Sequence, residues 1–240
     1  MNIEKGIRLV KKVKLKLLGY IHGCNSKGTK VLAEDWNYLI VLDACRYDCF
    51  EKVNWIEGKL EKRISLGTNT PEWMKRNFED GYYDDIIYIS ANPFVLRDID
   101  GFKMKEHFYK VIHIFDDKIG SLHPKKLNKV ALKVIRRYYG KRFIIHYLQP
   151  HHPFLLRMEL TPEKFLNGLV DVMEWKQAYL ENLVLVLEYV DKLLDVLDGK
   201  IIITSDHGEM LGEFGEIGHG CGVRFRELVE VPWFRIENGG

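Results

Sequence analysis

The chain has 240 residues, of which 46% are hydrophobic and 29% are charged. This composition is ordinary for a globular protein and excludes wholesale disorder, and the length suits one large domain. The 36 Lys and Arg residues against 34 Asp and Glu leave a formal net charge of +2, which argues against a polycation that coats nucleic acid. No apolar run approaches the roughly 20 residues that span a bilayer, and the first 20 residues lack the apolar core of a secretory signal.

Positive charge is concentrated in residues 1–30. Apolar residues recur there at three- and four-residue steps, a spacing that predicts a basic amphipathic helix. Such a helix either lies on an anionic membrane surface through residues 1–20 or packs on the body of the protein with a solvated lysine face, and the second interpretation is the simpler one. We expect residues 1–30 to form this helix and a loop, and residues 31–240 to form one domain. The basic residues are Lys5, Arg8, Lys11, Lys12, Lys14, Lys16, Lys27 and Lys30.

The chain contains four cysteines, Cys24, Cys45, Cys49 and Cys221. A chain of this length does not need disulfide bonds, and Cys45 and Cys49 have no second pair that would complete a structural zinc site. We therefore expect four thiols in a reducing compartment. This predicts a cytoplasmic protein, with membrane association if the basic helix binds lipid.

Strands and helices alternate along the rest of the chain. Near-continuous apolar runs rich in Ile and Val are typical of strands that are buried on both faces. Between them lie stretches with helical spacing. This alternation predicts an α/β fold, a three-layer sandwich with a mostly parallel central sheet. The expected strands are 38–42, 86–89, 111–115, 143–148, 201–204 and 228–234, and the expected helices are 70–79, 124–138 and 171–197.

Metal-binding residue types follow three of the expected strands. Asp43 follows the first strand, His151 and His152 follow 143–148, and Asp206 and His207 follow 201–204. In parallel sheets ligands bind beyond the carboxyl ends of the strands, so we expect these side chains to meet. Carboxylates combined with imidazoles suit Zn²⁺ or Mn²⁺ better than Ca²⁺ or Mg²⁺.

Each of these residues also has a structural interpretation. Asp43 could pair with Arg46 or cap the following segment. Asp206 could cap a helix while His207 makes a structural hydrogen bond. The two histidines at 151 and 152 could be a surface pair.

A segment rich in hydroxyl side chains, residues 65–73, precedes an expected helix. Pro71 fits the first helical position with Thr70 as its cap, which would leave Thr68 free to face the site. A threonine hydroxyl becomes a good nucleophile only when a metal or a base lowers its pKa. The helix N-terminus would favour a phosphate or sulfate group, but a plain capping turn would have the same sequence.

The remaining candidates are histidines. His151 and His152 could contact an ester oxygen, protonate a leaving group or bind a second metal. His219 lies on a Gly-rich loop and could reach the same sheet edge, or it could be structural. The histidines without a comparable setting are interpreted as structural: His22, His107, His113, His123 and His146.

Three motifs together resemble a known family. The sequence TSDHGEMLGEFGEIGHG followed by RELVEVPWF closely resembles the closing motif of the sulfatase-like branch of the alkaline phosphatase superfamily. YLIVLDACRYD resembles that family's first strand with its metal-binding Asp, and HYLQPHHPF resembles its internal histidine motif. The resemblance covers about residues 36–235.

The resemblance implies an alkaline-phosphatase-like sandwich with a metal-dependent hydrolase or transferase activity on sulfate or phosphate esters. It implies one divalent metal ion, Mn²⁺, Zn²⁺, Mg²⁺ or Ca²⁺, with Asp43, Thr68, Asp206 and His207 as ligands. Thr68 is the first choice for the nucleophile and Thr70 the alternative. His151, His152 and His219 match positions that contact the substrate or act as acids.

The sequence departs from the family in ways that narrow this expectation. TNTPEW lacks the Cys or Ser and the following Arg of the formylglycine motif, whereas threonine is the nucleophile of relatives that transfer phosphoglycerol or phosphoethanolamine. Gln149 stands near the Asp that a second metal site requires, so no full second site is expected. The expected substrate is a small-molecule, glycan or lipid-linked ester. The alternatives are a catalytically degenerate binding protein and a membrane-peripheral transferase.

Overall fold

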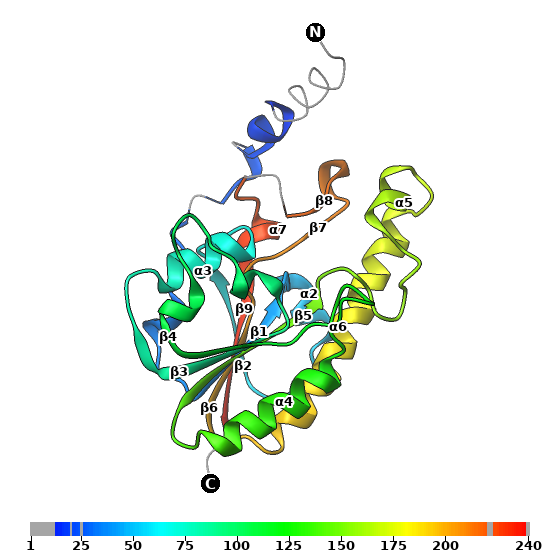
Figure 1. Ribbon diagram of the computed structural model, residues 1–240. Helices are drawn as coiled ribbons and strands as arrows, with labels where there is room; N and C mark the ends of the chain where they lie inside the picture. Colours follow the sequence, from blue (N-terminus) through cyan, green and yellow to red (C-terminus); the bar gives the residue numbers. More distant parts are fainter. Residues whose placement is uncertain (1–12, 20, 25, 220–222, 239–240) are drawn as a thin grey trace.

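The computed structural model describes residues 13–19, 21–24, 26–219 and 223–238 (Figure 1). Its central sheet has seven strands in the order β2-β9-β6-β1-β5-β3-β4. β6, β1, β5, β3 and β4 run parallel, β9 is antiparallel to β6, and β2 is antiparallel to β9. The expected α/β class with a mostly parallel sheet is confirmed. The strands are β1 (Tyr38–Asp43), β2 (Lys59–Ile64), β3 (Tyr83–Ser90), β4 (Phe108–His113), β5 (Arg142–Pro150), β6 (Gly199–Thr204) and β9 (Glu230–Asn238).

Helices cover both faces of the sheet (Figure 1). α2 (Tyr47–Val53), α4 (Pro124–Arg137) and α6 (Val172–Leu194) lie on one face, and α3 (Thr70–Phe78) lies on the other. The three expected helices correspond to α3, α4 and α6, with ends that differ by at most three residues. The shorter elements are α5 (Pro162–Leu166), α7 (Arg226–Val229), a hairpin of β7 (Met210–Leu211) and β8 (Ile217–Gly218), and the 3-10 helices η1 (Val31–Ala33), η2 (Pro93–Leu96), η3 (Met104–Glu106) and η4 (Glu213–Gly215).

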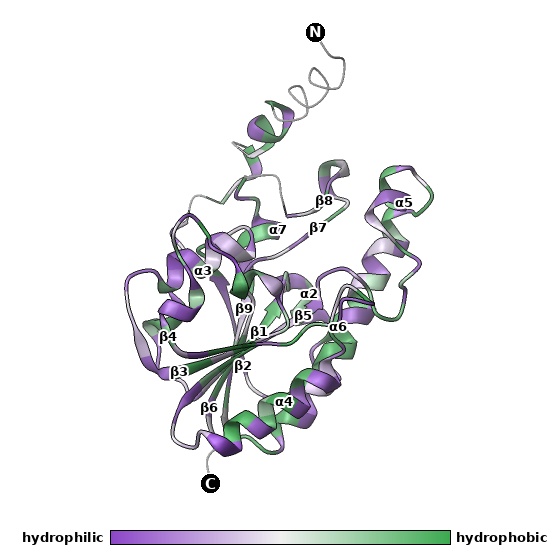
Figure 2. Cartoon of the chain, viewed as in Figure 1, coloured by the Kyte–Doolittle hydropathy of each residue, from purple (hydrophilic) through white to green (hydrophobic). Residues whose placement is uncertain are grey.

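The core is divided in two by the sheet. Ile40 and Leu42 of β1 pack among residues of α4 and α6, whereas Leu39 and Val41 pack against Trp73 of α3. Successive side chains of a strand point to opposite faces, so a central strand covered on both sides must be apolar at every position. Figure 2 shows the same division, with apolar strands inside and helices that are apolar on one side only.

The strand β2 is absent from the sequence predictions. Its sequence, KLEKRI, is mostly charged and lacks the apolar run that marks the central strands. It forms because it lies at the edge of the sheet, where it pairs with β9 and its Lys62 makes an ion pair of 2.8 Å with Glu230. The last expected strand also starts later than predicted, because residues 226–229 form the helix α7 first.

The described part of the N-terminal segment is helical from residue 13 to residue 19. Leu15 is buried in a small cluster with Phe225 and Met210, whereas Val13 is 50% exposed and Leu17 is 63% exposed. Residues 1–12, which carry much of the predicted amphipathic helix, lie outside the described residues. The division into a segment 1–30 and a domain 31–240 stays a prediction.

Two further findings concern the whole chain. Cys24, Cys45 and Cys49 are free thiols, and Cys221 lies outside the described residues. Within the described ranges, no helix has both the length and the hydropathy needed to cross a bilayer.

Candidate functional site

The candidate site lies where three neighbouring parallel strands end. Asp43 is the last residue of β1, and the neighbouring strands β5 and β6 lead into His151 and into Asp206 and His207. The turn after β1 places Ala44 at a φ of 59°, and its backbone N–H donates to Asp206 Oδ1 at 3.1 Å. The ends of β1 and β6 are thus joined directly, as the strand-end argument predicts.

Thr70, Asp206 and His207 are in contact at this edge. Thr70 Oγ1 donates a hydrogen bond to Asp206 Oδ2 at 2.7 Å and lies 3.3 Å from His207 Nε2. His207 Nε2 lies 3.3 Å from Asp206 Oδ2 and 3.7 Å from Asp43 Oδ1. All four side chains are buried. A hydroxyl, two carboxylates and an imidazole therefore share one small polar cluster.

The two threonines occupy different places. Asn69, not Thr70, caps α3, because the Asn69 side chain accepts a hydrogen bond from the Glu72 backbone at 3.0 Å. The Thr70 hydroxyl is thereby free to face the cluster. Thr68 instead donates to Glu72 Oε2 from its backbone N–H at 2.8 Å and from its hydroxyl at 3.2 Å. The expected cap was wrong by one residue, and the hydroxyl that contacts the Asp206 carboxylate is that of Thr70 and not that of Thr68.

His146 is part of the cluster, although the sequence analysis interprets it as structural. Its Nδ1 lies 2.8 Å from the hydroxyl of Tyr88, and its Nε2 lies 3.8 Å from Asp206 Oδ2 and 3.9 Å from Asp43 Oδ2. It sits within β5, two residues after Ile144, which faces α3. Alternation along β5 therefore places His146 on the face that meets α3, which the structure shows and the sequence alone does not.

Asn92 is a second residue that the sequence analysis missed. It follows β3, and its Nδ2 donates to Asp43 Oδ2 and, at 3.2 Å, to Thr70 Oγ1. One side-chain amide therefore links the carboxylate of β1 to the hydroxyl of α3. The strand-end argument applies equally to β3 and would have included this residue.

Burial and neighbouring charges shift the pKa values of the cluster. Burial, and then the neighbouring Asp206 carboxylate, raise the pKa of Asp43 well above its usual value. Burial opposes ionisation of Asp206 as well, but His207, His146 and the Thr70 hydroxyl hold its pKa below the usual value. Burial lowers the pKa values of His146 and His207 to about 4, so both imidazoles are neutral near pH 7 and keep a lone pair.

Two atoms of the cluster fit a cation. Asp43 Oδ1 and His146 Nε2 are buried, and neither has a hydrogen-bond partner. Buried polar atoms are normally paired, because burial without a partner is costly. Ligand atoms of Asp43, His146 and Asp206 lie within 4.8 Å of one another. Oxygen and imidazole donors at this spacing suit Zn²⁺ or Mn²⁺.

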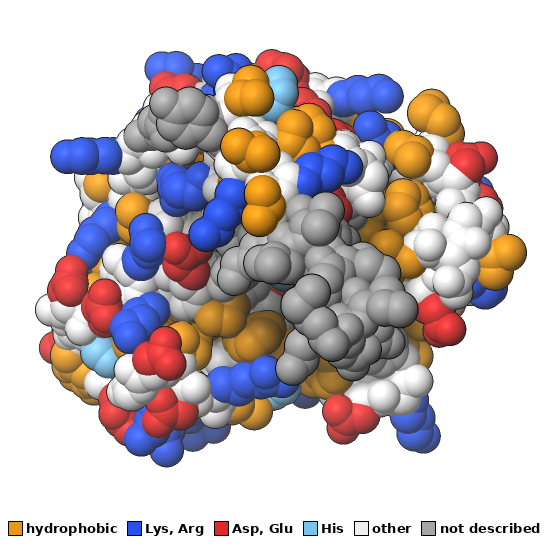
Figure 3. Space-filling model, turned by 90° about the horizontal axis from the view of Figure 1, so that it is seen from above, with side chains coloured by type: hydrophobic (Ala, Val, Ile, Leu, Met, Phe, Trp, Pro, Cys, Tyr) orange, Lys and Arg blue, Asp and Glu red, His pale blue; other side chains and the backbone are white. Residues whose placement is uncertain are grey.

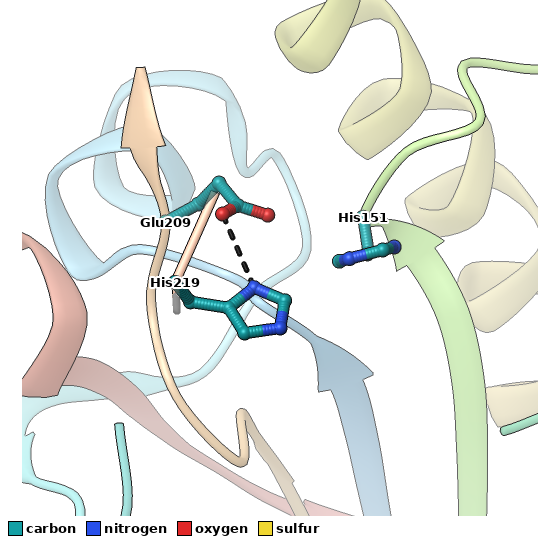
Figure 4. A group of neighbouring side chains, drawn as sticks. All are labelled: His151, Glu209 and His219. Carbon is teal, nitrogen blue, oxygen red and sulfur yellow. Dashed lines mark hydrogen bonds and ion pairs between the residues drawn. The ribbon is translucent and has the colours of Figure 1, made fainter. Parts of the chain in front are cut away.

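A second group of titratable side chains lies beside the cluster, formed by His151, Glu209 and His219 (Figure 4). His219 Nδ1 and Glu209 Oε1 form an ion pair of 3.2 Å, and the His219 ring centre lies 4.2 Å from that of His207. Burial opposes a charge on His219, but the hydrogen bond that His219 donates to Glu209 raises its pKa above the usual value. Burial lowers the pKa of His151. The two facing imidazoles therefore differ in basicity, with His219 the more easily protonated.

The same group bears on the expectation about a second metal. Ligand atoms of His151, Glu209 and His219 lie within 4.8 Å of one another. Gln149 takes no part, because its Nε2 donates to Ser121 Oγ at 3.0 Å and to the Leu122 carbonyl at 3.2 Å. This trio differs from the Asp and His pair that the second site of the family requires.

The cluster opens into a cleft of about 160 Å³. The histidines 151, 152 and 219 form one side of the cleft, and an apolar wall that includes Phe94 and Phe115 forms the other. His152 is held by its own packing, since its Nε2 lies 3.1 Å from the Leu160 carbonyl and its ring stacks on Trp175. Of the three expected histidines, His151 and His219 are therefore better placed than His152 to act on a substrate.

Gly208 and Arg46 hold the loop that carries Asp206 and His207. A Cβ at Gly208 would lie 2.0 Å from the Glu227 carbonyl oxygen, so only glycine allows this close approach to α7. Arg46 pairs with Glu213 at 2.9 Å and with Asp48 at 2.7 Å. The idea that Arg46 neutralises Asp43 was therefore wrong, because its guanidinium is engaged elsewhere.

Comparisons with known proteins identify the fold. No family model and no curated protein matches the chain. The C-terminal periplasmic domain of phosphoethanolamine transferase EptC from Campylobacter jejuni is 14% identical, with a TM-score of 0.59, 83% of this chain covered and 78% of that chain covered. The chain therefore shares the fold of this transferase domain.

Two other solved structures agree. The same domain of EcEptC from Escherichia coli, in complex with Zn, is 12% identical with a TM-score of 0.57, covering 90% of this chain and 77% of that one. Lipoteichoic acid synthase LtaP from Listeria monocytogenes is 11% identical with a TM-score of 0.55, covering 91% of this chain and 68% of that one. The fold relation that the motifs imply is confirmed.

Proposed function

We propose that the chain is a metal-dependent enzyme that transfers a phosphate-linked group through Thr70. The observation that carries the proposal is the Thr70 hydroxyl, which is buried and 2.7 Å from Asp206 in a cluster that contains two unpaired polar atoms. The similar structures support a phosphoethanolamine or glycerol phosphate type of transfer over sulfate hydrolysis, because their names describe phosphoethanolamine transferases and a lipoteichoic acid synthase.

The residues that would hold the ion are Asp43, Thr70, Asp206 and His207, with His146 as a further donor. When bound, a divalent ion would lower the pKa of a coordinated hydroxyl and neutralise negative charge on the transferred group. Zn²⁺ and Mn²⁺ suit these donors, and one similar structure is a complex with Zn. A single ion in this cluster is sufficient for the proposal.

The chain's own groups supply the remaining chemistry. Thr70 Oγ1 forms a bond to phosphorus while the bond from phosphorus to the leaving alcohol oxygen breaks, and the threonine proton passes to Asp206 Oδ2. His219, whose pKa Glu209 raises, gives a proton to the leaving oxygen. An acceptor alcohol or water then loses its proton to His219 and forms the new bond to phosphorus, while the bond from phosphorus to Thr70 Oγ1 breaks and this oxygen takes its proton back from Asp206 Oδ2. Asn92 keeps the Thr70 hydroxyl beside Asp43 throughout.

The class of substrate can be proposed, but not the individual compound. A phosphate ester that is small, glycan-bound or lipid-linked is consistent with the small cleft and with the similar structures. The cytoplasmic location stays a prediction, since two of the three similar structures are periplasmic domains.

The test compares the two threonines. Thr70→Ala should lower the cleavage rate of a chromogenic phosphodiester, measured with added Zn²⁺ or Mn²⁺, on the order of 10³-fold, because it removes the nucleophile. Thr68→Ala is the matched control and should stay within about threefold of the parent, because its hydroxyl only contacts Glu72. Parent-like activity of Thr70→Ala, or an equal loss in both variants, would refute the role of Thr70.

A further inference from the structure

Exposed apolar side chains are grouped around α5, at the end of the molecule that carries the candidate site (Figure 1). We call this group the α5 tip and define it by four exposed side chains, Leu166 at 65%, Leu169 at 72%, Val172 at 39% and Met173 at 74%. Six of the fifteen exposed large hydrophobic side chains in the described part of the chain fall between residues 156 and 173. Single exposed hydrophobic residues are normal, but a group of this density marks an interaction surface.

The α5 tip stands on a packed base. Phe154, Leu160, Val170 and Trp175 form a separate buried cluster beneath it. The segment therefore has an interior of its own, and the residues of the tip are left outside it. Since the buried cluster already fixes the segment, the exposed residues are not needed for folding. Binding to another molecule would explain why they are apolar.

The N-terminal helix presents a second apolar surface. Leu15 is 6% exposed and holds the helix on the body of the protein, whereas Val13 and Leu17 point outward. Lys14 and Lys16 are exposed beside them, and Lys14 Nζ also donates a long hydrogen bond of 3.5 Å to the Phe214 carbonyl oxygen. This helix therefore offers apolar and cationic side chains together on its outer side.

Both surfaces lie at the end of the molecule that carries the cleft. In Figure 1 the N-terminal helix and α5 project beyond the same end of the sheet, with β7 and β8 at that end as well. His219 directly follows β8, and β1, β5 and β6 end below it. Figure 3 views this end and shows hydrophobic side chains over α5 and over the N-terminal helix, with basic side chains among them.

We propose that an anionic lipid bilayer is the partner of this end, bound by the α5 tip and residues 13–17 together. Lysine is depleted from the cores of protein–protein interfaces, which argues against a second copy as the occupant. Apolar side chains flanked by lysines are what an anionic bilayer surface binds, with the apolar groups inserted into the interface. The sequence alone suggested a membrane contact through residues 1–20. The α5 tip is an additional surface for that contact.

The two surfaces contribute differently. Lys14 and Lys16 attract anionic headgroups, and this attraction weakens as salt screens it. The α5 tip carries Lys164 but also Glu163 and Asp171, so it binds by inserting leucines, and salt affects it little. One part of this proposal rests on the proposed function. If the chain transfers a phosphate-linked group, membrane binding implies that its substrate is a phosphate ester at a lipid surface.

The test is co-sedimentation of the full chain with vesicles. The parent should bind phosphatidylcholine vesicles that contain phosphatidylglycerol and bind pure phosphatidylcholine vesicles less. The double variant Leu166→Ser/Leu169→Ser should reduce binding by about tenfold or more at any salt concentration, because it removes two inserting side chains. Lys14→Glu/Lys16→Glu should reduce binding at low salt far more than at high salt.

The matched control changes equally exposed side chains at the other end of the sheet. Tyr139 is 96% exposed and Val196 is 55% exposed, and both precede the first residues of sheet strands. Tyr139→Ser/Val196→Ser should leave vesicle binding unchanged. Circular dichroism and thermal melting of each variant would show whether it is folded.

Two outcomes would overturn the proposal. One is a parent protein that does not bind anionic vesicles, including the case in which the parent self-associates through the α5 tip instead. The other is a folded Leu166→Ser/Leu169→Ser variant that binds as the parent does. Thr70→Ala should bind vesicles normally. The proposed catalytic role of Thr70 and the proposed membrane contact can therefore be refuted separately.

Discussion

His146 is a buried side chain with one ring nitrogen that has no hydrogen-bond partner. Its Nδ1 faces the Tyr88 hydroxyl at 2.8 Å, while its Nε2 faces two carboxylates at distances too long for hydrogen bonds. Burial keeps the imidazole neutral by lowering its pKa to about 4. In the tautomer in which Nδ1 donates to Tyr88, Nε2 has a lone pair that faces two carboxylates, an arrangement that a bound cation would stabilise.

His146→Leu should therefore weaken ion binding by about tenfold or more, as the loss of a donor or of its supporting contact does in other metal sites. The measurement is competition with a chelator for Zn²⁺, followed by thermal melting in excess chelator, where the variant should be less stable by about 1–3 kcal/mol because the buried Tyr88 hydroxyl loses its partner. His113→Leu is the control, because His113 also has an unpaired ring nitrogen but lies on β4. Equal Zn²⁺ affinity of the parent and His146→Leu would rule out this role.

At the residue scale, strand ends were easier to predict than strand interiors. The strand-end argument brings Asp43, Asp206 and His207 together, and the structure places them in contact. His146 escaped because the sequence does not show which face of β5 meets α3. Thr70 was ranked second because both Asn69 and Thr70 are good caps, and only the backbone geometry distinguishes them.

At the scale of the element, the start of α3 controls the direction of Thr70. Asn69→Ala should lower the free energy of unfolding by about 1 kcal/mol, because the Glu72 N–H loses its acceptor. It should also lower phosphodiester cleavage, because the first turn that directs the Thr70 hydroxyl is loosened. Urea denaturation and the activity assay measure the two effects.

The helix α6 provides the matched control for this prediction. Its cap, Asp171, accepts a hydrogen bond from the Glu174 backbone at 2.8 Å. Asp171→Ala should lower the stability by a similar amount but leave cleavage of the phosphodiester unchanged. If both variants lost activity in proportion to stability, the cap of α3 would have no special relation to the site.

Elements were predictable where burial determines the sequence. The central strands β1, β5 and β6 are mostly apolar because both of their faces are buried, and the long helices have an apolar stripe that must pack on the sheet. The edge strand β2 was not predictable, since its charged residues are stabilised by partners such as Glu230 that lie far away in the sequence. The hairpin of β7 and β8 is too short to leave a pattern.

At the scale of the whole molecule, Glu34 ties the chain before β1 to its last strand. It accepts hydrogen bonds from Arg235 Nε at 2.9 Å and from Trp233 Nε1 at 3.1 Å, and it pairs with Arg63 of β2. The hydrogen bond from Arg235 is the main reason that its pKa is lowered to about 2 from a usual value of 4.5. A lowered carboxyl pKa stabilises the fold above pH 4.5, and this contribution is lost as the pH falls toward 2.

Glu34→Gln should therefore lower the free energy of unfolding at pH 7 by about 1–2 kcal/mol, allowing for solvent screening. The difference from the parent should shrink steadily between pH 4.5 and pH 2.5. Urea denaturation at several pH values measures it. Glu57→Gln, which changes an exposed glutamate between α2 and β2, should have no effect at any of them. A pH-independent difference for Glu34→Gln would contradict the assignment.

The strand order also determines when the cluster can form during synthesis. Ala44 and Asp206 are hydrogen-bonded although they are 162 residues apart in the sequence, and β6 lies between β1 and β9. A ribosome needs on the order of ten seconds or more to make that intervening stretch. Until β6 has emerged from the ribosome and paired with β1, a nascent chain contains Asp43 and Thr70. It lacks Asp206 and His207, so the polar cluster cannot form. If the proposed function is right, the topology therefore leaves unfinished chains without two of the groups that the reaction needs.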